Sequence, residues 1–238
     1  MKTTLRFASA LLLSSVAAIA ADNGWVNLFN GKDLSGWVQR GGKAKYTVQE
    51  GILVGSTVLD TPNSFLCTEK TYGDFILELE FKVDPLLNSG VQVRCECFDT
   101  EKKVQANGKE IRIPAGRVHG YQVEIDMDAA KNRWWSGGIY DEGRRAWLYP
   151  GILGGDSKAF TEQGAKVSKP GEWNHYRIEA RGASIKTWLN GQLRATINDN
   201  MTPRGFIALQ VHSVGKDASK ENLKVQFRNI RLKELPGN

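Results

Sequence analysis

The 238-residue sequence has few cysteines, and it has no long apolar run after its first twenty residues. Its three cysteines, Cys67, Cys95 and Cys97, form neither a zinc-ligand pattern nor a Cys-x-x-Cys redox motif. No segment after residue 20 is long and apolar enough to span a bilayer as a helix. These absences exclude a cysteine-ligated zinc module, a thioredoxin-like redox protein and a helical membrane protein.

The sequence also lacks a strong excess of one charge sign. After residue 20, 30 basic residues stand against 26 acidic ones, which gives a formal net charge of +4. The densest basic cluster, Arg133 with Arg144 and Arg145, is interrupted by Asp141 and Glu142. A nucleic-acid-binding protein is expected to concentrate its Lys and Arg on one face, so nucleic acid is not the expected partner.

The first twenty residues are typical of a secretory signal peptide. Lys2 and Arg6 form a positive segment, an apolar stretch of 13 residues follows it, and Ala18 and Ala20 are the small residues that signal peptidase requires. We therefore expect cleavage near Ala20 and a secreted or periplasmic protein of residues 21–238. No cysteine lies directly after the cleavage site, so no lipoprotein membrane anchor is expected.

An exported protein can form disulfides, and the three thiols allow two interpretations. Cys95 and Cys97 lie two residues apart, so either could pair with Cys67 if the strands are neighbours. Alternatively, all three are small apolar residues of the interior.

Alternation of apolar and polar residues with a period of two dominates the chain. It is seen at residues 75–83, 91–97, 121–127 and 207–212, and no stretch of a dozen residues has the pattern of an amphipathic helix. Asn190-Gly191, between two such runs, is a strong β-hairpin signal. The sequence therefore predicts an all-β protein, a jelly-roll sandwich of two antiparallel sheets. We expect a single domain over residues 21–238, because there is no linker, repeat or change in composition.

Short or planar polar side chains collect on the predicted solvent faces of three strands. They are Gln92, Arg94 and Glu96 on the first, Gln122, Glu124 and Asp126 on the second, and Gln210 and His212 on the third. Such groups suit sugar hydroxyls and proton transfer, whereas an idle face would carry scattered lysines and threonines. His212 is the favoured histidine because it shares a face with Gln210. The pattern predicts a carbohydrate site on one face of the sandwich.

A conventional retaining glycosidase is one alternative, because Glu124, Asp126 and Asp128 alternate like the carboxylates of retaining β-glucanases. That mechanism needs two carboxyl groups about 5–5.5 Å apart. The Cα atoms of Glu124 and Asp128 are expected about 13 Å apart, given a rise of about 3.3 Å per strand residue. Using Glu124 and Asp128 as the catalytic pair would therefore require side chains that lean toward each other or a bulge in the strand.

Several motifs along the chain resemble those of the 3-keto-disaccharide hydrolase family. They follow family order at residues 28–37 (LFNGKDLSGW), 88–91 with Arg94, 120–124 (GYQVE), 138–141 (GIYD), 171–174 (GEWN), 188–191 (WLNG), 208–212 (ALQVH) and 227–231 (FRNIR). This resemblance implies a concanavalin-like jelly roll and an activity on glycosides oxidised at carbon 3 of the sugar.

The chemistry implied by that resemblance assigns roles to the polar residues. A ketone at C3 acidifies the C2 proton, so a base can remove it and the C1 substituent can leave by elimination, after which water adds. The expected base is His212 or Glu124, Arg94 stabilises the enolate, and Asp126 or Glu124 protonates the leaving oxygen. A divalent metal on Glu124, Asp126 and His212 could replace Arg94. Substrate contacts are expected from Gln92, Gln122, Tyr140 and Gln210, with Trp134 or Trp135 stacking on the sugar.

A non-catalytic carbohydrate-binding jelly roll is the other alternative, because lectins share this architecture and a fold does not determine a function.

Overall fold

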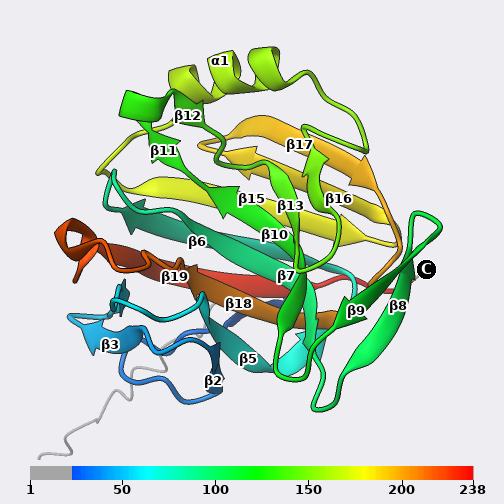
Figure 1. Cartoon of the computed structure of the whole chain (residues 1–238), viewed down its shortest axis with the longest axis horizontal. Helices are drawn as coiled ribbons and strands as arrows, with labels where there is room; N and C mark the ends of the chain where they lie inside the picture. The colour runs from blue at the N-terminus through cyan, green and yellow to red at the C-terminus, as the bar shows by residue number, and fades with distance from the viewer. Residues whose placement is uncertain (1–22, 238) are drawn as a thin grey trace, which may run out of the picture.

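The computed structural model describes residues 23–237 and forms a sandwich of two antiparallel sheets (Figure 1). In spatial order, the eight-stranded sheet contains β17 (Gln192–Asn198), β16 (Ser184–Leu189), β15 (Asn174–Arg181), β6 (Phe75–Val83), β19 (Lys224–Glu234), β4 (Ile52–Ser56) and β3 (Lys45–Gln49), with β1 (Trp25–Asn27) also paired to β19. The seven-stranded sheet contains β14 (Ala146–Tyr149), β13 (Ile139–Glu142), β10 (Val118–Ile125), β7 (Ser89–Cys97), β18 (Gly205–Val211), β5 (Ser64–Tyr72) and β2 (Trp37–Gly41). This arrangement confirms the predicted all-β jelly roll. The predicted signal peptide over residues 1–20 lies outside the described residues.

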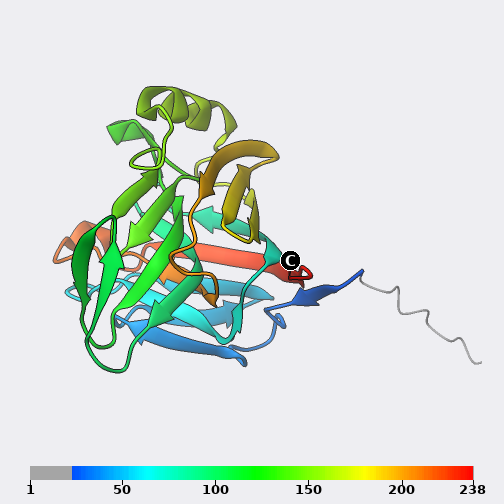
Figure 2. The same cartoon turned by 90° about the vertical axis from the view of Figure 1, so that its right-hand side faces the viewer.

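Smaller elements decorate the sandwich. They are the pair β11 (Met127–Asp128) and β12 (Arg133–Trp134), the hairpin β8 (Lys102–Ala106) and β9 (Lys109–Ile113), the helix α1 (Ser157–Val167), and two 3₁₀ turns, η1 (Ala129–Lys131) and η2 (Ala218–Lys220). Helix α1 lies over one end of the sandwich, near β12 and β17 (Figure 1). The β8–β9 hairpin projects on the side of the seven-stranded sheet, whereas β1 lies on the other side of the molecule (Figure 2). None of the helices within residues 23–237 is both long and apolar enough to cross a membrane.

One continuous hydrophobic cluster fills the space between the sheets. The seven-stranded sheet contributes Val91 and Val93 of β7 and Val123 and Ile125 of β10, all of them completely buried. Because side chains alternate along a strand, Gln92, Gln122 and Glu124 emerge on the opposite, outer face of this sheet. The period-two pattern therefore correctly predicts which side chains the core uses.

The alternation is broken at Arg94. This residue has a φ of 50°, and the pairing of β7 shifts at this point against both β10 and β18. A β-bulge of this kind moves the following residues to the other face. Cys95 therefore joins Cys67 and Phe206 in a small apolar cluster on the outer face, whereas the sequence predicts it beside Val91 and Val93.

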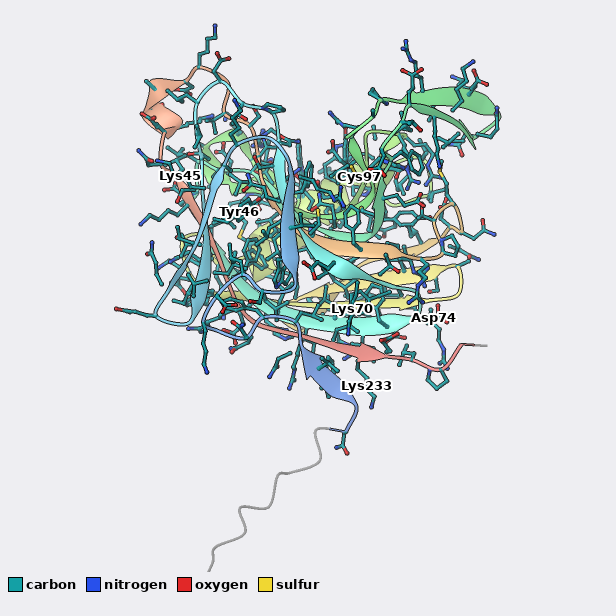
Figure 3. All side chains as sticks on the ribbon, turned by 90° about the horizontal axis from the view of Figure 1, so that it is seen from below. Lys45, Tyr46, Lys70, Asp74, Cys97 and Lys233 are labelled. Carbon is teal, nitrogen blue, oxygen red and sulfur yellow. The ribbon has the colours of Figure 1, made fainter. Side chains whose placement is uncertain are left out.

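The three cysteines are all free thiols. Cys67 and Cys95 are completely buried, and burial raises the pKa of the Cys67 thiol to about 12. Cys97 is partly exposed and lies near the base of the β8–β9 hairpin (Figure 3). The structure therefore agrees with interior thiols for Cys67 and Cys95 and contains no disulfide among these three residues.

Candidate active site

A cleft of about 300 Å³ opens on the outer face of the seven-stranded sheet. Seven of the residues that the sequence predicts for the site line it: Gln122, Glu124, Asp126, Trp135, Tyr140, Gln210 and His212. They come from β10, β13, β18 and the segments that follow β10, β12 and β18. The structure therefore brings most of the predicted residues together on one surface.

Hydrogen bonds from a network of glutamine side chains hold the Glu124 carboxylate in place. Gln122 Nε2 donates to Glu124 Oε2 at 2.7 Å, and Gln122 Oε1 accepts hydrogen bonds from Gln210, at 2.9 Å, and from Gln92. Gly90 makes this arrangement possible, because a Cβ atom there would lie 2.6 Å from Cδ of Gln122. The amides therefore fix the orientation of the Glu124 carboxylate before any substrate binds.

Asn88 links Glu124 to Asp126. Its Nδ2 donates to Glu124 Oε1 and, at 3.1 Å, to Asp126 Oδ2. Asp126 also forms an ion pair with Arg133, whose Nη2 lies 2.8 Å from Oδ2. Across the cleft, Arg117 forms an ion pair with the buried Glu142. The cleft thus holds three buried carboxyl groups and two guanidinium groups.

Burial raises the pKa of Glu124 from its ordinary value of 4.5 to about 7. The hydrogen bonds from Asn88 and Gln122 favour the charged form and oppose this shift, whereas the charges of Asp126 and Glu142 add to it. Burial also raises the pKa values of Asp126 and Glu142, against the lowering effects of Arg133 and Arg117. A carboxyl group with a pKa near 7 can both accept and return a proton at neutral pH.

This raised pKa predicts a pH dependence of stability. Between pH 4.5 and about 7 the unfolded chain has lost the Glu124 proton that the folded protein keeps. The stability that protonated Glu124 contributes is therefore fully present below pH 4.5 and is lost as the pH rises through 7. Across this range the free energy of unfolding falls by about 3 kcal/mol. Urea unfolding of the wild type and of Glu124→Gln at pH 4.5 and pH 8 measures this change in the free energy of unfolding. A difference between the two proteins that is the same at both pH values would contradict the raised pKa.

Arg94 does not reach the cleft, so the prediction that it stabilises an enolate there is wrong. Its Nε donates to Gly73 O at 2.8 Å, its Nη1 to Gly182 O at 2.7 Å and its Nη2 to Asp74 Oδ1 at 2.9 Å. The side chain is completely buried. The bulge at Arg94 turns this guanidinium toward the β5–β6 and β15–β16 turns, and Asp74 marks the first of these turns in Figure 3.

Three other predicted residues also lie away from the cleft. Gln92 is completely buried and contacts Gln122, so it supports the site without lining it. Trp134 packs against the hydrophobic core, which leaves Trp135 as the tryptophan of that pair at the cleft. Asp128 caps η1 and forms an ion pair with Lys131 at 2.9 Å. The structure therefore does not supply Asp128 as a partner of Glu124 for a retaining glycosidase.

The predicted metal ligands Glu124, Asp126 and His212 do not form a metal site. Within residues 23–237, no group of three or more His, Cys, Asp and Glu side chains is arranged to hold a metal ion. Asp126 instead pairs with Arg133, and Asn88 donates to both carboxylates. The carboxylate oxygens that a metal ion would need as ligands are thus already bonded to a guanidinium and an amide group.

Sequence reasoning missed several residues of the cleft, namely Asn63, Asn88, Arg117, Arg133, Glu142 and Trp147. Two of them carried a usable signal. Glu142 lies two residues after Tyr140 on β13 and so shares its face, and Asn88 begins one of the motifs quoted above. Arg117 and Asn63 lie between strands, where no periodic pattern indicates the direction of a side chain.

A protein-family model matches nearly all of the described residues. The family model described as a 3-keto-alpha-glucoside-1,2-lyase-like domain matches residues 24–233. No curated protein matches the sequence.

Solved structures with the same fold include two proposed glycosyl hydrolases from Parabacteroides distasonis. One is 20% identical, with 90% of this chain and 95% of that chain covered and a TM-score of 0.54. The other is 24% identical, with 89% and 99% covered and a TM-score of 0.51. A Bacillus subtilis protein of unknown function with a galectin-like fold is 11% identical, with 90% and 96% covered and a TM-score of 0.58. At these identities the three structures support the jelly-roll fold alone.

Proposed function

Because the chain belongs to the 3-keto-alpha-glucoside-1,2-lyase-like family, we propose that it is an exported enzyme that cleaves the glycosidic bond of 3-keto-glycosides. The family match supports a broader class, namely jelly-roll proteins that bind carbohydrates or resemble glycosyl hydrolases. The observation that carries the finer proposal is Glu124, a buried carboxyl group with a pKa of about 7 in a cleft lined by planar polar side chains. Export, predicted from residues 1–20, is part of the proposal.

The reaction begins with removal of the C2 proton by a base, which the neighbouring ketone makes acidic. The electron pair forms an enolate between C2 and the C3 oxygen. When the C3 carbonyl forms again, a double bond forms between C1 and C2, and the bond between C1 and the leaving oxygen breaks. The leaving oxygen takes a proton. Water then adds to C1 and a proton to C2, which yields the free 3-keto sugar and an alcohol.

Glu124 is the proposed base, and it returns the same proton to the leaving oxygen. Its pKa of about 7 suits both halves of this transfer. Arg133 is linked to Glu124 by three polar contacts in series, through Asp126 and Asn88, and takes the role of enolate stabiliser that Arg94 cannot fill. His212 Nδ1 lies 2.7 Å from Ser213 O and therefore carries the proton, which leaves Nε2 free to accept the proton of the attacking water.

The direct test compares ordinary glucosides of both anomers with their 3-keto derivatives and follows release of the alcohol. We expect release from the 3-keto derivative alone. Release from both types would indicate a conventional glycosidase. Binding without release would indicate a carbohydrate-binding module, which is the second candidate because lectins share this jelly-roll architecture and a fold does not determine a function.

A further inference from the structure

A second, largely apolar compartment adjoins the active-site cleft. It has a volume of about 380 Å³ and is lined by Trp135, Trp147, Pro150 and Ser157, which we name the aromatic platform. Trp135 and Trp147 also line the cleft. The two compartments are therefore adjacent, and the same two tryptophans line both.

The aromatic side chains run without a break from the cleft to the platform. The ring centroids of Tyr140 and Trp147 are 5.5 Å apart, and those of Trp147 and Trp135 are 5.6 Å apart, both in edge-to-face geometry. The cleft is rich in amide, carboxyl and guanidinium groups, whereas Ser157 provides the one polar side chain among the four residues that line the platform. A second sugar ring would find few hydrogen-bond partners there, but a flat apolar ring would find matching surface.

The platform is held in place by a buried arginine. Arg194 donates from Nη1 to Phe160 O of α1 at 3.0 Å, from Nη2 to Trp134 O at 3.1 Å and from Nε to Ser136 O at 3.0 Å. These bonds tie the helix that carries Ser157 to the segment that carries Trp135. Because this surface is fixed before binding, a ligand ring loses little affinity to ordering of the protein.

We propose that the aromatic platform binds the leaving group of the substrate, and that the preferred substrates are 3-keto-glycosides whose leaving group carries an aromatic ring. This inference rests on the proposed function, since the sugar ring occupies the cleft beside Glu124. The glycosidic oxygen then lies at the boundary formed by Trp135 and Trp147, and the ring extends toward Pro150 and Ser157.

The test uses benzyl and methyl 3-keto-glucosides, because benzyl alcohol and methanol have nearly the same acidity as leaving groups. With wild-type protein we expect KM to be about 10- to 100-fold lower for the benzyl compound, the effect of burying one aromatic ring. Trp147→Ala should remove most of this preference. Ser157→Trp, a change at an exposed helix position that fills the platform, should also remove it. Trp188→Ala, on a strand of the other sheet, is the tryptophan control that should keep it.

Calorimetric binding of benzyl and methyl glucosides without the keto group separates this inference from the proposed function. If neither 3-keto compound is cleaved, the proposed reaction fails, but tighter binding of the benzyl glucoside that Ser157→Trp abolishes would still support the platform. Equal KM and equal affinity for benzyl and methyl compounds would overturn the inference. A benzyl preference that both Trp147→Ala and Ser157→Trp retain would overturn it as well.

Discussion

Replacement of Glu124 by glutamine is expected to lower kcat on a 3-keto-glycoside by about 100- to 10,000-fold, the usual contribution of a general base. Glutamine keeps the size of the side chain but cannot accept the C2 proton. In the wild type, kcat/KM should rise with pH through about 7, because the base must be ionised and burial raises its pKa to that value. Steady-state kinetics from pH 5.5 to pH 8.5 measure both effects.

Asp128→Asn is the matched control for this experiment. Asp128 follows Glu124 by four residues, but its carboxylate contacts Lys131 outside the cleft. Its replacement should leave kcat within about twofold of the wild type, since asparagine keeps the size of this buried side chain and can still cap η1. If Glu124→Gln retained wild-type kcat, or if the wild-type pH profile were flat, Glu124 would not be the base.

The shared face of Gln122, Glu124 and Gln210 could be predicted from the sequence because strand geometry alone decides it. Side chains two residues apart lie on the same face, and a buried apolar set on one face leaves the polar set on the other. The apolar residues at alternate positions of each strand therefore determine which face its polar residues occupy. Local rules therefore predict the sheet, its inner face and the floor of the cleft.

Arg94 shows where this reasoning fails. The alternation places it beside Gln92, but one residue in a left-handed conformation shifts the register and reverses the faces that follow. An arginine carries no signal for positive φ, unlike the glycine or asparagine expected there, so only the tertiary structure reveals the bulge. Arg117 and Arg133 were missed for a related reason, because residues in loops and two-residue strands have no period to follow.

The corrected position of Arg94 predicts a large loss of stability with little loss of catalysis. Arg94→Met should lower the free energy of unfolding by about 3 to 5 kcal/mol, the usual effect of breaking a buried ion pair. The substitution leaves the carbonyl groups of Gly73 and Gly182 without their donor and leaves Asp74 without its cation. Urea unfolding measures the loss of stability, and kcat measured well below the transition temperature should stay within about twofold of the wild type.

Arg112→Met is the matched control, because Arg112 forms an ion pair with Glu101 on the exposed β8–β9 hairpin. Exposed pairs contribute at most about 1 kcal/mol, so this variant should unfold almost like the wild type. Glu124→Gln and Arg94→Met should thus produce opposite phenotypes, one losing turnover and keeping its fold, the other losing stability and keeping turnover. A hundredfold loss of kcat in Arg94→Met at unchanged stability would show instead that Arg94 takes part in the reaction and that its side chain reaches the cleft.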